Sequence, residues 1–123
     1  MASPTRDGDE SGERDSPAGG RLEDLPNVVL ADYPRIYEET YRNGALPTRT
    51  KEIVALAISI ARNCEPCYRY HLSRLADAGA VDDILTEEEF ADLVALVLVT
   101  VGSLALPPAR NALEIFRRLA TVD

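Results

Sequence analysis

Apolar residues recur along this chain at intervals of three to four positions, the spacing that places them on one face of a helix. No segment shows the two-residue alternation that is typical of a strand. Five segments follow the helical pattern and are joined by short links: residues 32–42, 48–61, 64–78, 86–101 and a last segment that starts at residue 107 or 108. The pattern therefore predicts an all-α fold, a compact helical bundle.

The first predicted helix has Asp32 as its N-cap. Its inner face is predicted to be a stripe of four residues at helical spacing, Ile36, Tyr37, Thr40 and Tyr41. Tyr33 joins Tyr37 and Tyr41 in a row of tyrosines four residues apart. Such a row could line a substrate pocket, but packing with the hydroxyl groups at the rim is the more common role.

The second predicted helix, with Thr48 or Thr50 as its cap, carries a carboxylate ahead of an apolar run. Residues 53–61 are apolar nearly all round, which is typical of a buried helix. Glu52 precedes that run, in the first turns of the helix. Periodicity leaves two interpretations open for Glu52: a solvated residue that suits the helix dipole, or a functional group.

The fourth predicted helix is the most hydrophobic part of the chain. Thr86 and Glu89 have the spacing of a capping box at its start, and residues 90–101 are mostly apolar. Asp92 interrupts this run, which is shorter than the ~20 apolar residues that span a bilayer, so we expect no membrane span. We expect instead a core helix that also contacts a neighbouring subunit, with Val97 as a candidate for its outward side.

The first 21 residues are rich in Ser, Gly, Pro, Asp and Glu and contain almost no apolar side chains. This composition predicts a disordered acidic tail at residues 1–21, and residues 22–123 are predicted to form one helical domain. The tail has neither the apolar segment of a secretory signal nor the character of a transit peptide, so we expect a cytoplasmic protein. The formal net charge of −8 and the pI of 4.6 argue against binding to nucleic acid.

All residues capable of thiol or imidazole chemistry lie in one short stretch, residues 63–71. It contains the only two cysteines, Cys64 and Cys67, and the only histidine, His71. If this stretch is helical from Cys64, a rotation of 100° per residue places Cys67 ~60° and His71 ~20° from Cys64, so all three share one face. With Asn63 as N-cap, both cysteines would lie in the first turn, where the helix dipole favours the reactive thiolate.

The spacing of the two cysteines suits reversible disulfide chemistry. In a helical turn their Cα atoms are ~5 Å apart, within the roughly 4.4–6.8 Å range of disulfides, so the pair can close and reopen with little backbone motion. Pro66 lies between them, in the first turn, where its missing N–H costs no intrahelical hydrogen bond. The alternative is that two buried cysteines pack as small hydrophobic side chains.

The composite pattern is more specific than the cysteine pair alone. Glu52, eleven intervening residues, Cys64-x-x-Cys67, three more residues and His71 resemble the E-x11-C-x-x-C-x-x-x-H signature of the alkylhydroperoxidase D (AhpD)-like branch of the carboxymuconolactone decarboxylase family. The similarity extends from about Pro34 to the C-terminus. The resemblance implies a helical bundle that assembles as a homotrimer or a homohexamer.

The resemblance further implies a thiol-dependent peroxidase or disulfide oxidoreductase. Cys67 would be the nucleophile that attacks a hydroperoxide or receives an oxidised partner, and Cys64 would resolve the product as a disulfide. His71 would transfer the proton, and Glu52 would orient the imidazole. A dithiol donor, such as a lipoyl domain or a thioredoxin-like protein, would restore the thiols. Pro66 stands where AhpD has a second histidine, so we expect modest turnover of peroxide.

Two other functions are compatible with parts of the pattern. A zinc-binding or redox-sensing module could use Cys64, Cys67, His71 and Glu52 as ligands, although structural zinc sites usually take two ligand pairs from separate elements. Lactone decarboxylation, the reaction that names the wider family, relies on acid–base groups rather than on a dithiol. The chain has neither a GxGxxG nor a P-loop pattern, so we expect no nucleotide cofactor.

Overall fold

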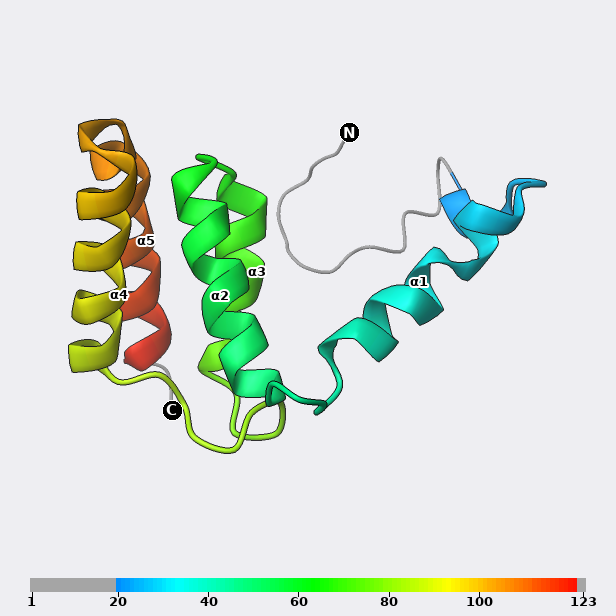
Figure 1. Cartoon of the computed structure of the whole chain (residues 1–123), viewed down its shortest axis with the longest axis horizontal. Coiled ribbons are helices and arrows are strands. Elements are labelled where there is room, and N and C mark those ends of the chain that lie inside the picture. Colours follow the sequence, from blue (N-terminus) through cyan, green and yellow to red (C-terminus); the bar gives the residue numbers. More distant parts are fainter. Residues whose placement is uncertain (1–19, 122–123) are drawn as a thin grey trace. The chain divides into compact units, whose positions relative to one another are not determined.

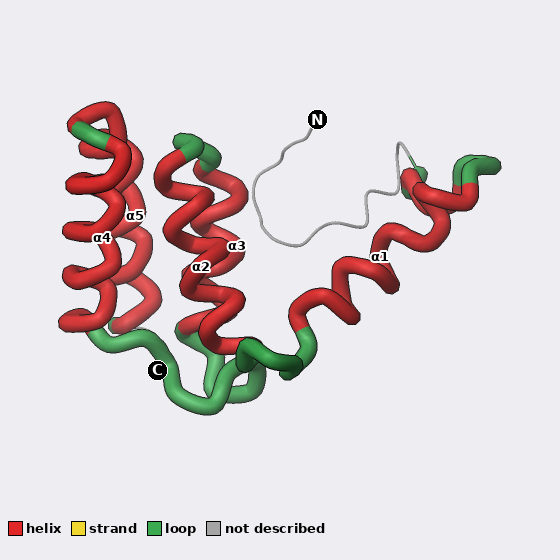
Figure 2. The backbone as a smooth tube through the Cα atoms, viewed as in Figure 1, coloured by secondary structure: helices red, strands yellow, loops and turns green. Residues whose placement is uncertain are grey.

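The computed structural model describes residues 20–121, and every regular element in that range is a helix (Figures 1 and 2). These elements are η1 (Leu22–Asp24), α1 (Val28–Tyr41), α2 (Thr48–Ala61), α3 (Glu65–Leu75), α4 (Glu87–Val101), η2 (Ser103–Ala105) and α5 (Leu106–Ala120). The all-α prediction is confirmed for this part of the chain. The tail predicted at residues 1–21 lies outside the described residues, except for its last two positions.

The described chain separates into two units, one ending at Arg42 and the other beginning at Asn43. The first unit consists of η1 and α1. Asn27 is the N-cap of α1, because its Oδ1 accepts hydrogen bonds from the backbone N–H groups of Val29 (2.9 Å) and Leu30 (3.2 Å). The predicted cap at Asp32 is therefore wrong: the helix begins earlier, directly after the capping side chain of Asn27.

The predicted inner stripe of α1 is also corrected, since none of the helix's residues is buried. Ile36 and Thr40 are exposed, while Tyr37 and Tyr41 are half-buried. The ring centroid of Tyr37 lies 6.2 Å from that of Tyr33 and 4.9 Å from that of Tyr41, so the tyrosines pack against one another along α1. Periodicity shows which side chains share a face but does not show whether another element covers that face.

Helices α2 to α5 form the second unit, in which α2 packs on α3, α4 and α5, and α3 packs on α5 (Figure 1). The rings of Phe90 on α4 and Phe116 on α5 stack with their centroids 4.7 Å apart. The core takes side chains from all four helices, among them Leu56, Ile60, Tyr68, Leu72, Leu75, Phe90, Leu93, Val97, Ala112, Ile115 and Phe116. This shared core fixes α2 against α3, the two helices that carry the predicted site residues.

Helix α4 begins with the predicted capping box. The Thr86 Oγ1 accepts from the backbone N–H of Glu89 (3.1 Å), and the Glu89 carboxylate accepts from the backbone N–H of Thr86 (3.0 Å). Val97 is only 4% exposed and belongs to the core, so its predicted outward position is wrong. The exposed apolar residues of this helix are Leu96 (63%) and Val99 (86%). Within residues 20–121, no helix is long and apolar enough to cross a membrane.

Candidate active site

The predicted site residues lie on α2 and α3, which a link of three residues joins into a helical hairpin (Figure 1). Asn63 in this link has a positive φ of 56°. Its N–H bonds to the carbonyl of Ile60, and the N–H of Cys64 bonds to the carbonyl of Ser59, both at 3.0 Å. This pairing is a Schellman motif, which satisfies the last carbonyls of α2 and reverses the chain.

Asn63 therefore ends α2 rather than capping α3, and the predicted N-cap is wrong. The N-cap position of α3 is occupied by Cys64, whose carbonyl accepts the N–H of Tyr68 (3.0 Å). Glu65 and Pro66 follow as the first two helical residues, and Cys67 is the third. Both cysteines still lie at the positive end of the α3 dipole, where a thiolate is favoured.

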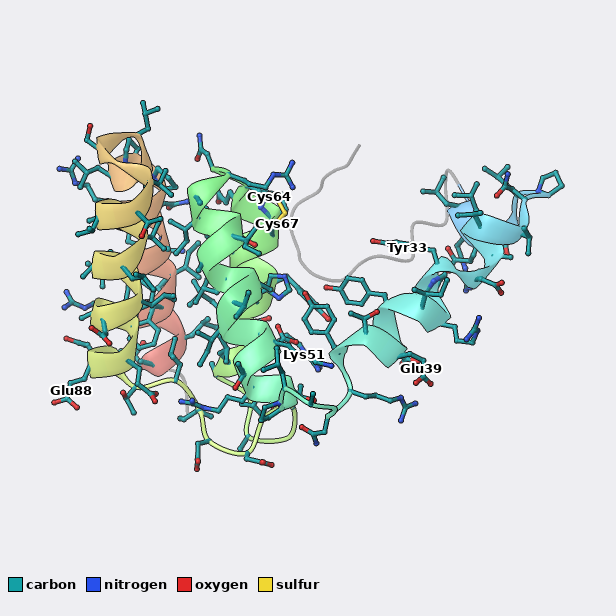
Figure 3. The ribbon with its side chains drawn as sticks, viewed as in Figure 1. Tyr33, Glu39, Lys51, Cys64, Cys67 and Glu88 are labelled. Carbon is teal, nitrogen blue, oxygen red and sulfur yellow. A yellow bond between two sulfur atoms is a disulfide. The ribbon has the colours of Figure 1, made fainter. Side chains whose placement is uncertain are left out.

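Cys64 and Cys67 are joined by a disulfide bond at the end of the α2–α3 hairpin (Figure 3). Their Cα atoms are 5.3 Å apart, within the range predicted from the spacing. Both residues are half-buried, so the bond borders solvent instead of lying in the core. The alternative of two separate thiols that pack as small hydrophobic side chains does not fit this arrangement.

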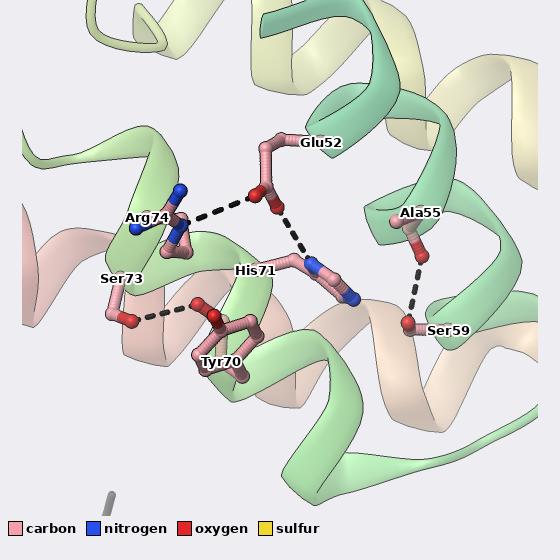
Figure 4. Close-up of polar contacts among 7 residues, drawn as sticks. All are labelled: Glu52, Ala55, Ser59, Tyr70, His71, Ser73 and Arg74. Atoms are coloured by element: carbon pink, nitrogen blue, oxygen red, sulfur yellow. Dashed lines mark hydrogen bonds and ion pairs between the residues drawn. The ribbon is translucent and has the colours of Figure 1, made fainter. Parts of the chain in front are cut away.

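Glu52 and His71 face each other across the interface of the two helices. The Nδ1 of His71 lies 2.7 Å from the Oε1 of Glu52 (Figure 4). Glu52 is 1% exposed and His71 is 7% exposed. A carboxylate that is removed from water to this extent requires hydrogen bonds or a counter-charge. Glu52 is thus a buried partner of His71, and the interpretation of a solvated first-turn residue is wrong.

A third side chain completes the network, and the sequence interpretation missed it. The Nε of Arg74 donates to the Oε2 of Glu52 at 3.2 Å, so the carboxylate lies between the guanidinium and the imidazole (Figure 4). Burial alone would lower the pKa of Arg74, but the hydrogen bond to Glu52 and the nearby negative charge outweigh it and raise that pKa above its ordinary value. Arg74 follows His71 by three residues, so the sequence places both on one face of α3, but this spacing does not show that Glu52 lies opposite.

The network determines which nitrogen of His71 can act as a base. An ionised Glu52 only accepts hydrogen bonds, so a neutral His71 must donate the hydrogen on Nδ1 and carry its lone pair on Nε2. We assign this tautomer from the hydrogen-bond partners. The ring of Tyr70 contacts that of His71 edge to face, with the centroids 5.2 Å apart, and helps to hold the imidazole in place.

The structure thus brings the four predicted site residues together as two pairs. Glu52 and His71 form a hydrogen-bonded pair, and Cys64 and Cys67 form a disulfide. His71 lies four residues after Cys67 on α3, which places the two side chains next to each other on one face of the helix. The arrangement therefore combines a disulfide at a helix start with a histidine that a buried carboxylate orients.

The zinc interpretation finds no support in this geometry. The described residues contain no group of three or more His, Cys, Asp or Glu side chains that could hold a metal ion. The two sulfur atoms are bonded to each other, and the Nδ1 of His71 is engaged by Glu52. A ligand set of two sulfurs, a nitrogen and an oxygen is therefore not assembled here.

The sequence model of the carboxymuconolactone decarboxylase family matches residues 29–117. The chain belongs to this family. The match contains every residue of the site and confirms the family that the E-x11-C-x-x-C-x-x-x-H pattern predicted.

Solved structures of a Thermotoga maritima protein share this fold. That protein is a carboxymuconolactone decarboxylase family member for which a part in an antioxidative response has been suggested. Two crystal structures of it match with TM-scores of 0.65 and 0.64 at 29% and 28% identity, covering 76% of this chain and 76% and 78% of theirs. An uncharacterized protein of Cupriavidus necator is 24% identical over 100 residues, which is 81% of this chain and 84% of that protein.

Proposed function

We propose that this chain is a thiol-dependent oxidoreductase that cycles Cys64 and Cys67 between a dithiol and a disulfide, and thereby reduces hydroperoxides or partner disulfides. The observation that carries the proposal is the disulfide at the start of α3 with the buried Glu52–His71 pair one turn away (Figures 3 and 4). The family and the antioxidative response suggested for the Thermotoga maritima protein support the same chemistry.

The cycle begins when the Nε2 of His71 takes the proton of the Cys67 thiol. The thiolate attacks one oxygen of a hydroperoxide, the O–O bond breaks, and the departing alkoxide takes the proton from His71 and leaves as an alcohol. Cys67 is then a sulfenic acid. The Cys64 sulfur attacks the Cys67 sulfur, the disulfide forms, and the hydroxyl group leaves with the Cys64 proton as water. Cys67 takes the first role because it lies next to His71 on α3.

A dithiol donor must then reduce the disulfide, and a lipoyl domain or a thioredoxin-like protein has the required chemistry. Its thiolate attacks one sulfur of the half-buried pair, and its second thiol releases the mixed disulfide. The cytoplasm is the compartment that keeps such donors reduced. Pro66 stands between the cysteines where AhpD has a second histidine, and His71 is the only histidine in the sequence. The site therefore contains one imidazole, and exchange with the donor is expected to be faster than peroxide reduction.

We also propose that the chain assembles with copies of itself, as a homotrimer or a homohexamer. Leu96 and Val99 are exposed on α4, and Val54 and Ile58 are exposed on α2, which packs beside α4. Apolar side chains on two adjacent helices are the kind of surface that a second subunit covers. The number of subunits is taken from the family resemblance.

Thiol counting tests the redox cycle. In the reduced wild-type protein, peroxide should convert two free thiols per chain to none, without intermolecular disulfides on a non-reducing gel. The variant Cys64→Ser should react once and accumulate a sulfenic acid that a specific probe labels, whereas Cys67→Ser should not react. Thiols that resist both peroxide and an oxidised dithiol partner would refute the proposal. Labelling of Cys64 in Cys67→Ser would reverse the two roles.

The same variants separate this function from lactone decarboxylation. Proton abstraction and loss of carbon dioxide need acid–base groups, which Glu52 and His71 could supply without the cysteines. A protein with both cysteines replaced by serine should therefore lose all activity under our proposal. Turnover of a lactone by that double variant would favour decarboxylation instead.

A further inference from the structure

We propose that Arg74 is a positioning residue: its positive charge compensates the negative charge of Glu52 and so favours the neutral form of His71, which can accept the proton of Cys67. The inference rests on the proposed function, because it assigns a task within the same site. Arg74 reaches the carboxylate through Nε at 3.2 Å, on the oxygen that His71 does not use. Each oxygen of the buried Glu52 thus has its own N–H donor (Figure 4).

The argument begins with the charge that Glu52 brings into the protein. A buried carboxylate beside an imidazole favours the charged form of that imidazole, because the two opposite charges stabilise each other. Without a second counter-charge, Glu52 would therefore favour the charged form of His71 more strongly. An imidazolium carries both of its protons already and cannot accept one from a thiol.

Arg74 changes this balance by supplying a permanent positive charge at the second oxygen. Because Arg74 already compensates the charge of Glu52, the carboxylate stabilises a protonated His71 less, and the neutral imidazole is favoured. The side chain of Arg74 is only 35% exposed, so solvent screens this interaction incompletely. The planar guanidinium remains charged throughout the working pH range.

Two further groups near the network act on Arg74 itself. The electrostatic interactions of Tyr70 and Asp77 with Arg74 favour its cationic form. From α5, the other helix packed on α3, Asn111 donates to the hydroxyl of Tyr68 at 2.7 Å and carries no charge. Among these contacts, Arg74 is the cation that meets Glu52.

The neutral network suits both directions of the proton transfer. When the Nε2 of His71 takes the proton of Cys67, the new imidazolium and the new thiolate appear together, and their charges cancel. Because Arg74 reduces the stabilisation of the imidazolium by Glu52, His71 can donate the proton to the departing alkoxide. A base of intermediate strength is the most effective in a reaction that needs it as an acid afterwards.

Titration of His71 by proton NMR tests the inference directly, since His71 is the only histidine in the chain. In the reduced protein, Arg74→Met removes the charge but keeps most of the stem, and the midpoint of the His71 titration should rise by about one pH unit. Arg74→Lys restores the charge and should return the midpoint toward the wild-type value. At a pH below the new midpoint, thiol oxidation in Arg74→Met should be about tenfold slower than in wild type, because the rate follows the fraction of His71 that is neutral.

Arg69→Met is the matched control. Arg69 lies on the same helix, and its loss changes the net charge equally, but it pairs with the exposed Glu65 instead of Glu52. The midpoint of His71 should not move in this variant. A shift as large as that of Arg74→Met would show that overall charge, and not the contact with Glu52, sets the titration.

Glu52→Gln is the reference for the direction of the shift: loss of the carboxylate should by itself move the His71 midpoint to lower pH, opposite to the shift in Arg74→Met. Equal midpoints in Arg74→Met and wild type, or an Arg74→Lys midpoint no closer to wild type than that of Arg74→Met, would overturn the inference. Failure of the proposed function is a separate outcome. If wild type turns over neither peroxide nor disulfides while the midpoints shift as expected, the charge balance stands and the redox cycle falls.

Discussion

At the scale of single residues, the proposed proton path relies on two buried polar groups, Glu52 and His71, and glutamine is a polar substitute for each. His71→Gln keeps a polar side chain at a 7% exposed position, and Glu52→Gln keeps a hydrogen-bond acceptor beside it. If His71 takes the thiol proton, its replacement should lower the rate of thiol oxidation ~10²-fold or more. Glu52→Gln should act in the same direction, because the imidazole loses its orienting carboxylate.

The double variant decides whether the two residues act as one unit. If both serve one proton path, the double variant should be little slower than the slower single variant. Stopped-flow oxidation of the reduced protein measures these rates, and thiolate absorbance against pH reports the activation of Cys67. Ser73→Ala, an exposed change on the same helix, is the control. Multiplicative losses, or undiminished turnover in either single variant, would make Glu52 and His71 independent or merely structural.

The sequence identified four of the residues in this site but not their whole network. Fixed spacing placed Cys64, Cys67 and His71 on one helix, because that relation is local. The contact of Arg74 with Glu52 joins α2 to α3, and periodicity within one helix contains no information on which residue of another helix lies opposite. Asn63 was misassigned because asparagine suits both an N-cap and a left-handed helix end, and the reversal between two packed helices selected the second.

At the scale of elements, helix starts that depend on a side-chain cap could be predicted only where the capping signal was complete. Thr86 and Glu89 form a reciprocal box at the start of α4, and the sequence shows both partners. Asn27 caps α1 alone, next to Pro26, and its signal was not recognised. Helix α3 ends at Leu75, before the predicted end at residue 78, because the chain turns at Asp77, whose carbonyl accepts the N–H groups of residues 80 and 81.

The capping box gives α4 a stability that depends on pH. The backbone N–H of Thr86, followed by Arg49 on α2, lowers the pKa of Glu89 from its ordinary value of 4.5. A carboxyl group with a lowered folded-state pKa contributes stability above its unfolded pKa and loses it as the pH falls through the folded one. The stability difference between wild type and Glu89→Gln should therefore be present at pH 7 and shrink as the pH falls below 4.5.

Urea unfolding at several pH values measures this difference. Glu88→Gln, an exposed change in the same turn, is the control and should show a smaller difference at every pH. Thr86→Ala removes the other half of the box and should cost about 1 kcal/mol at pH 7. An effect of Glu89→Gln that grows toward low pH would contradict the assigned direction of its pKa.

At the scale of the whole molecule, the proposed assembly follows from the apolar surface that α4 leaves uncovered. The sequence showed that this helix is apolar nearly all round, but it did not show which side faces the core. The packing decides this point: at 100° per residue, Val97 shares the inner face with Phe90 and Leu93, whereas Leu96 and Val99 lie outside it. Val97, which the sequence suggested for the outward side, therefore lies in the core, and its substitution would test folding instead of assembly.

Two substitutions two residues apart on α4 separate assembly from folding. Val99→Glu places a charge at an 86% exposed position and should dissociate the oligomer while helicity and cooperative unfolding are kept. Val97→Glu places the same charge at a 4% exposed core position and should unfold the second unit instead, because a buried carboxylate without a partner is strongly unfavourable. Light scattering gives the mass and circular dichroism the fold, and Ala91→Glu, exposed on the same helix, should change neither. A wild-type mass equal to one chain, or an oligomer that tolerates Val99→Glu and Leu96→Glu together, would exclude this face of α4 as the contact between subunits.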